Sequence, residues 1–162
     1  MRLYLVQHGD ALPEEVDPAR PLSAAGRSDV AAVARFLAAG GVRVPKVLHS
    51  GKLRAEQTAA LLAEAVAPGR APAARSGLDP KDPPDGIARE AAAWEEDVML
   101  VGHLPFMARL ASRLLAGRDD AGVVDFRPGA AVCLERGDRQ HWSIVWMIRP
   151  ELVAPARQQG EA

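Results

Sequence analysis

A continuous apolar run at residues 98–101, Val-Met-Leu-Val, most limits the folds open to this chain. Four apolar residues in a row are typical of a central parallel strand that is covered on both faces. Apolar segments at residues 3–6 and 46–49 are also followed by a polar loop and then by apolar residues at helical spacing. This alternation of strand and helix predicts the α/β class.

The other expected elements follow from breakers and caps. Ser23 is a plausible N-cap for a helix that ends at Gly40-Gly41, and Ser50 could cap the next helix. Five prolines between residues 68 and 86 predict an irregular loop, which we interpret as a lid or a substrate-facing segment. The remaining predictions are a helix at 53–66, a short strand near 73–75, helices at 87–94 and from Pro105 to Gly117, and core strands at 130–135 and 142–148 joined by a turn at 136–138.

Composition indicates one globular domain. The chain has 162 residues, 48% hydrophobic and 25% charged, which suits a single core over residues 1–150 with a polar C-terminal tail at 151–162. A net charge of -1 argues against nucleic acid and anionic membranes as partners. The apolar run at 3–6 is too short for a signal peptide, so a cytoplasmic protein is expected. The single cysteine, Cys133, lies in an apolar run and is interpreted as core.

Three groups of polar residues follow predicted strands at the point where each strand ends. His8 follows the first, Ser50 with Arg54 the second, and His103 the strand at 98–101. Ligands of open α/β sheets collect at the carboxyl ends of the strands, so these side chains should converge. Gly9 would let backbone approach a ligand, and a helix N-terminus near Ser50 would add partial positive charge. Because the guanidinium of Arg54 can form bidentate hydrogen bonds with phosphoryl oxygens, a phosphate is the expected ligand.

This order of motifs resembles the histidine phosphatase superfamily, also called the phosphoglycerate mutase-like family, and within it the small phosphohistidine phosphatases of the SixA type. The resemblance spans roughly residues 1 to 150 and implies a three-layer α/β/α fold with a mostly parallel central sheet. Four ordered motifs together are more specific than any one alone. The motifs are His8-Gly9-Asp10-Ala11, Arg20-Pro21-Leu22-Ser23 with Gly26, Leu53-Arg54-Ala55-Glu56-Gln57-Thr58 after Ser50, and Gly102-His103-Leu104-Pro105.

The resemblance also implies roles. His8 would be the nucleophile that forms a covalent phosphohistidine, which water then hydrolyses without a metal or another cofactor. Arg54 and His103 would share in catalysis and, with Arg20, bind the phosphoryl oxygens. The implied substrate is a phosphohistidine-bearing protein, such as a phosphotransfer domain of a signalling relay, and inorganic phosphate is the product. The other expected phosphate-binding residues are Gln7, Gly9 and Ser50.

The chain departs from the family pattern at two points. Gln7 stands where the family usually has arginine, so slower catalysis or altered substrate choice is expected. A clear general acid is also missing, and only Asp79 and Asp82 in the proline-rich loop are candidates. An imidazole leaving group needs an acid less than an alkoxide does, which favours phosphohistidine.

Two alternatives remain open from the sequence. One is a phosphatase of small phosphomonoesters with the same site, and the other is a phosphate- or phosphoprotein-binding module with little turnover. His49 and His141 match no family motif and are not assigned to the site.

Overall fold

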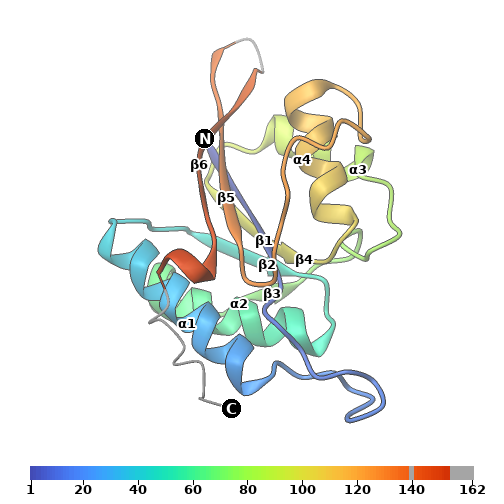
Figure 1. Cartoon of the computed structure of the whole chain (residues 1–162). Coiled ribbons are helices and arrows are strands. Elements are labelled where there is room, and N and C mark those ends of the chain that lie inside the picture. The colour runs from blue at the N-terminus through green and yellow to red at the C-terminus, as the bar shows by residue number, and fades with distance from the viewer. Residues whose placement is uncertain (139–140, 154–162) are drawn as a thin grey trace.

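The fold is built on one mixed β-sheet of six strands, with the strand order β3-β2-β4-β1-β5-β6 (Figure 1). The computed structural model describes residues 1–138 and 141–153. Its strands are β1 (Arg2–Gln7), β2 (Lys46–His49), β3 (Ala73–Ala74), β4 (Val98–Gly102), β5 (Ala131–Arg136) and β6 (Trp142–Ile148). Its α-helices are α1 (Ala24–Ala39), α2 (Leu53–Val66), α3 (Asp85–Ala93) and α4 (Phe106–Ala116).

The sheet is mostly parallel, as expected. β4 pairs in parallel with β1 on one side and β2 on the other, and β3 continues the parallel part beyond β2. All five residues of β4 are buried, which confirms it as a central strand covered on both faces. β5 and β6 complete the sheet as antiparallel strands.

Helices cover both faces of the sheet and give the predicted three layers (Figure 1). On one face, Val33 of α1 and Leu62 of α2 pack in one core with Tyr4 and Val101 of the sheet. On the other face, α3 and α4 pack in a second core around Leu100. Because successive side chains of a strand point to opposite faces, each buried strand supplies residues to both cores.

The loop after β1 is held against the start of α1. Ser23 caps this helix as predicted: its hydroxyl accepts a hydrogen bond from the Gly26 amide at 2.9 Å and donates to the Asp10 carboxylate at 2.6 Å. A Cβ on Gly26 would lie 2.1 Å from the Asp10 carbonyl oxygen, so only glycine permits this approach. These contacts fix the backbone next to His8.

Two expectations about single elements were wrong. β6 is an edge strand with Ile144 and Val145 exposed, and not a core strand, because nothing follows it in the sheet order of the described residues. Pro150 is buried at the start of a short 3-10 helix (Pro150–Leu152). The predicted start of the tail at residue 151 stays a prediction. The rest of the predicted tail, residues 154–162, lies outside the described residues. α2 has Lys52 and not Ser50 at its N-cap position.

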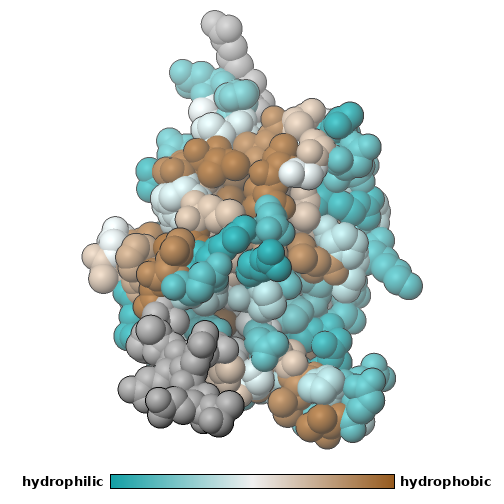
Figure 2. Space-filling model, viewed as in Figure 1, coloured by the Kyte–Doolittle hydropathy of each residue, from teal (hydrophilic) through white to brown (hydrophobic). Residues whose placement is uncertain are grey.

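Among helices in residues 1–138 and 141–153, none combines the length and the apolar content that a membrane crossing requires. Hydrophilic and hydrophobic side chains alternate in patches over the face shown in Figure 2.

Candidate active site

His8 follows the last residue of β1, and its two ring nitrogens have different partners. Nδ1 lies 2.7 Å from the Gly9 carbonyl oxygen, and Nε2 lies 3.2 Å from Nε of Arg54. A carbonyl oxygen only accepts and a guanidinium only donates. Both contacts therefore require the same tautomer, with the proton on Nδ1 and a free electron pair on Nε2 directed at Arg54.

The environment keeps the His8 ring neutral. Burial, with a smaller contribution from the positive charges of Arg54 and Arg20, lowers the pKa of His8 to about 4. The hydrogen bond to the Gly9 carbonyl and the charge of Asp10 oppose this shift without cancelling it. At neutral pH Nε2 is thus unprotonated, as a nucleophile must be.

Gly9 has a different use from the one expected. Its amide donates to the Thr58 hydroxyl at 3.0 Å, and its carbonyl accepts from His8, so both backbone groups are engaged within the protein. A Cβ on Gly9 would lie 2.7 Å from Cγ2 of Val30 in α1. Gly9 therefore brings the loop onto α1, and it orients His8 instead of offering its amide to a ligand.

Thr58 is a site residue whose role the sequence did not reveal. It is fully buried in α2, where its hydroxyl donates to the Arg54 carbonyl at 2.7 Å while it accepts from the Gly9 amide. One hydroxyl thus joins the turn that carries Arg54 to the loop that carries His8. The spacing of Arg54 and Thr58, one helical turn apart, was the available signal.

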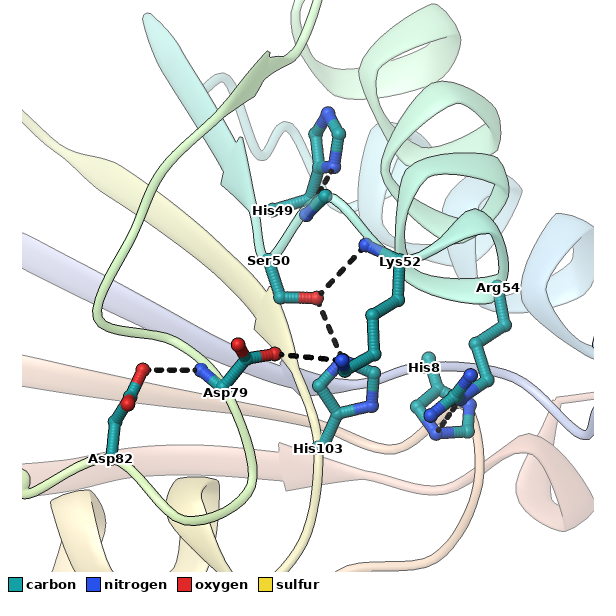
Figure 3. A network of polar contacts seen from close by, with 9 residues as sticks. His8, His49, Ser50, Lys52, Arg54, Asp79, Asp82 and His103 are labelled. Atoms are coloured by element: carbon teal, nitrogen blue, oxygen red, sulfur yellow. Dashed lines mark hydrogen bonds and ion pairs between the residues drawn. The ribbon is translucent and has the colours of Figure 1, made fainter. Parts of the chain in front are cut away.

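Ser50 and His103 lie next to each other at the ends of β2 and β4 (Figure 3). The Ser50 hydroxyl oxygen is 2.6 Å from His103 Nε2 and accepts a long hydrogen bond, 3.4 Å, from the Lys52 amide. A hydroxyl oxygen has two acceptor positions, so in this pair the Ser50 hydroxyl can donate to Nε2 or accept from it. When Ser50 donates, His103 carries its own proton on Nδ1. Ser50 thus orients His103 and does not cap α2.

His103 faces His8. The two ring centroids are 4.9 Å apart, and the planes are inclined by 59°. His103 is 2% exposed, and its Nδ1 has no hydrogen-bond partner within the described chain. Burial, followed by nearby His8, Arg54 and Lys52, lowers the pKa of His103 to about 3, while Asp79 opposes the shift. A buried ring nitrogen without a partner is costly, so Nδ1 is suited to form a hydrogen bond with a ligand.

Arg20 belongs to the neighbourhood of the site although it lies in the loop before α1. It has a positive φ of 50°, and its Nε donates to the Leu12 carbonyl at 3.2 Å. Its charge lowers the pKa of both His8 and Arg54, so it lies within electrostatic range of each. The charge of Arg20 therefore acts at the site, although the contacts of the described residues include none between Arg20 and His8.

Gln7 is buried, with 8% of its surface exposed. Its backbone is held by Ala130 and Gly129 of the turn before β5, and it pairs with Gly102 of β4. Its side-chain oxygen makes no hydrogen bond to any described residue. Position 7 thus contributes a neutral amide to the interior next to His8, with no charge.

The two candidate acids differ in position (Figure 3). Asp79 places Oδ1 3.1 Å from Nζ of Lys52, and its charge acts on the pKa of His103. Asp82 accepts a hydrogen bond from the Asp79 amide at 2.8 Å and so belongs to the turn of the loop. His49 is buried in β2, where Nδ1 accepts from the Gly51 amide at 3.1 Å, which agrees with a structural role.

No group of three or more His, Cys, Asp or Glu side chains in the described ranges is arranged to hold a metal ion. The metal-independent reaction stays a prediction.

The free energy of unfolding is expected to decrease as the pH falls from 7.5 to 5. The pKa is about 4 for native His8 and about 3 for native His103, against about 6.5 in an unfolded chain. The unfolded state therefore binds protons in this window and the native state does not, so stability present above pH 6.5 is lost towards pH 4. The expected loss by pH 5 is about 2 kcal/mol for each histidine. Urea unfolding in phosphate-free buffer at several pH values measures it.

Replacing both histidines by asparagine should remove most of this pH dependence. The matched control is His141→Asn, since His141 is exposed. An unchanged slope in the double variant would show that other groups cause it.

Known proteins resemble this chain in sequence and in structure. No protein-family model matches the chain. An uncharacterized protein of Picosynechococcus sp. is 32% identical over 145 residues, which cover 81% of this chain and 87% of the relative.

Among solved structures, the protein histidine phosphatase SixA complexed with tungstate has a TM-score of 0.82 and 24% identity, covering 94% of this chain and 99% of that one. A candidate phosphohistidine phosphatase SixA from Agrobacterium tumefaciens has a TM-score of 0.74 and 26% identity, covering 92% of this chain and 97% of that one. The near-complete overlap in both directions means that the whole domain is shared. The chain belongs to the histidine phosphatase superfamily and is of the SixA type.

Proposed function

We propose that this protein is a phosphohistidine phosphatase, which removes the phosphoryl group from a histidine of another protein through a covalent intermediate on His8. One observation carries the proposal: the free electron pair of His8 Nε2 is directed at Arg54, with the opposite nitrogen held by the Gly9 carbonyl. A neutral, oriented imidazole beside a guanidinium is an arrangement in which a phosphoryl group can be bound and attacked.

The charges around His8 suit the transferred group. A phosphoryl group carries nearly two negative charges at neutral pH. Arg54 contacts His8 directly, Arg20 acts on it through its charge, and His103 offers a buried Nδ1 without a partner among the described residues. Donors that are already fixed stabilise developing charge without reorganisation in the transition state.

The reaction would proceed in two displacements. The electron pair of His8 Nε2 attacks phosphorus, the substrate's N–P bond breaks, and its electron pair leaves with the substrate imidazole, which keeps a proton on its other nitrogen. Water then attacks the phosphorus on His8 and loses a proton to solvent. The electron pair of the P–Nε2 bond returns to His8, and inorganic phosphate leaves.

Among the described residues, neither candidate acid is free of other contacts, which favours phosphohistidine over an alkyl phosphate. Asp79 forms an ion pair with the Lys52 ammonium. Asp82 is used by the loop itself. A neutral imidazole leaves without an acid, whereas an alkoxide must be protonated.

Two solved structures that resemble this chain are those of a histidine phosphatase and of a candidate phosphohistidine phosphatase, which agrees with this proposal. We propose a cytoplasmic phosphoprotein, such as a phosphotransfer domain, as the partner.

A direct comparison of substrates tests the function. The purified protein, treated with a chelator, is given a phosphohistidine-bearing phosphotransfer domain and, separately, an alkyl phosphate, and phosphate release is measured. We expect kcat/KM to be at least about a hundredfold higher for phosphohistidine. Equal or higher rates on the alkyl phosphate would assign the site to small phosphomonoesters. Orthophosphate binding with no release from either substrate would identify a binding module.

A further inference from the structure

Lys52 lies next to Ser50 and His103, and no sequence motif indicated a role for it. It immediately precedes α2, and its amide donates to the Ser50 hydroxyl that orients His103. In Figure 3 its side chain extends past Ser50 towards the His103 ring, beside the side chain of Arg54. The ammonium ends 3.1 Å from Oδ1 of Asp79.

The site needs more positive charge than its buried groups supply. His8 and His103 are neutral at pH 7, because their pKa values are about 4 and about 3. Gln7, buried next to the nucleophile, is neutral as well. Arg54 and Arg20 remain, and Arg20 uses its Nε on the Leu12 carbonyl. A phosphoryl dianion would therefore attract any further cation within reach.

We propose that Lys52 is a phosphoryl-binding residue of this site, which exchanges its ion pair with Asp79 for a phosphoryl oxygen when an anion binds at His8. Its flexible four-carbon stem and compact ammonium suit such a movement. This inference rests on the proposed phosphoryl-transfer site, and it adds a residue that neither the motifs nor the order of strands indicates.

The exchange is favourable because the existing ion pair is weak. The side chains of Lys52 and Asp79 are 40% and 52% exposed, so water screens their attraction. Such a pair changes an equilibrium by no more than about fivefold. A contact between an ammonium and a doubly charged phosphoryl group in a partly buried site is worth about tenfold to a hundredfold. Asp79 thus holds Lys52 next to Ser50 and competes only weakly with a phosphoryl group for its ammonium.

Orthophosphate affinity, measured by titration calorimetry at pH 7.5 and fixed low salt, tests the inference without requiring turnover. Lys52→Met should weaken binding by about tenfold to a hundredfold. Asp79→Asn should strengthen it by up to about fivefold, because Lys52 no longer has to leave a partner. The double variant should bind as weakly as Lys52→Met alone.

Two variants serve as references. Lys46→Met removes the same charge from the exposed start of β2, at the far end of this strand from Ser50, and should leave affinity unchanged. Arg54→Met should lose most binding. If Arg54→Met weakens binding but Lys52→Met does not, the inference is wrong and the proposed site stands. If Asp79→Asn weakens orthophosphate binding, Lys52 does not exchange Asp79 for a phosphoryl oxygen, and the inference is wrong. If the unaltered protein binds no orthophosphate, both the inference and the proposed function fail.

Discussion

Replacing His8 by alanine is expected to reduce phosphate release from phosphohistidine by about 10⁴-fold or more, which in practice abolishes it. The substitution removes the only atom, Nε2, whose electron pair is directed at the Arg54 guanidinium among the described contacts. Water would then have to attack the substrate directly, without a covalent intermediate. The remaining cations still bind the phosphoryl group, so KM should change far less than kcat.

Two measurements separate the role of His8 as nucleophile from a merely structural role. Brief reaction with labelled substrate followed by denaturation should leave an acid-labile, base-stable label on the unaltered protein and none on His8→Ala. Orthophosphate binding should survive in His8→Ala, which shows that the site is still folded. The control His141→Asn changes an exposed histidine and should keep both label and turnover. Undiminished turnover in His8→Ala would contradict the proposed mechanism, in which His8 is the nucleophile.

Arg54→Met should reduce kcat/KM by about 10²- to 10³-fold, the second largest effect we expect. Arg54 has two functions in the structure. Its Nε donates to His8 Nε2, which helps to fix the tautomer, and its charge contributes to the low pKa of His8. Both functions are lost together, so the pKa of His8 should rise in this variant while catalysis falls.

Arg54→Lys distinguishes charge from geometry. Lysine keeps the positive charge but not the planar guanidinium, so we expect a loss between those of the unaltered protein and Arg54→Met. Arg35→Met, on the exposed side of α1, is the matched control. The pKa of His8 followed by NMR and the kcat/KM of each variant test the two functions separately. If the rate falls but the pKa of His8 does not rise, Arg54 does not act through His8, and its role is to bind the phosphoryl group.

Local patterns predicted most of the fold. The apolar run at 98–101 became the central strand β4, and the apolar positions of α1 and α2 lie on the faces that pack against the sheet. These predictions succeeded because burial of a strand or helix face depends on the spacing of neighbouring residues. The prediction that β6 is a core strand was wrong. Its composition suits a core strand, but its place at the sheet edge depends on the whole topology, which local spacing does not specify.

The site shows a similar division. That His8, Ser50 and His103 converge could be inferred from their positions after strands, because parallel strands bring their carboxyl ends together. Their partners could not be inferred. Ser50 bonds His103 across 53 positions, and the Gly9 amide meets Thr58 across 49.

The sequence by itself therefore determined the α/β class, the family and the convergence of His8, Ser50 and His103, since these depend on local spacing and ordered motifs. Only the tertiary structure decided the tautomer of His8, the low pKa values of His8 and His103, and the pairing of Lys52 with Asp79. Each of these depends on burial and on distances between atoms far apart in the chain, and no pattern of neighbouring residues specifies either quantity.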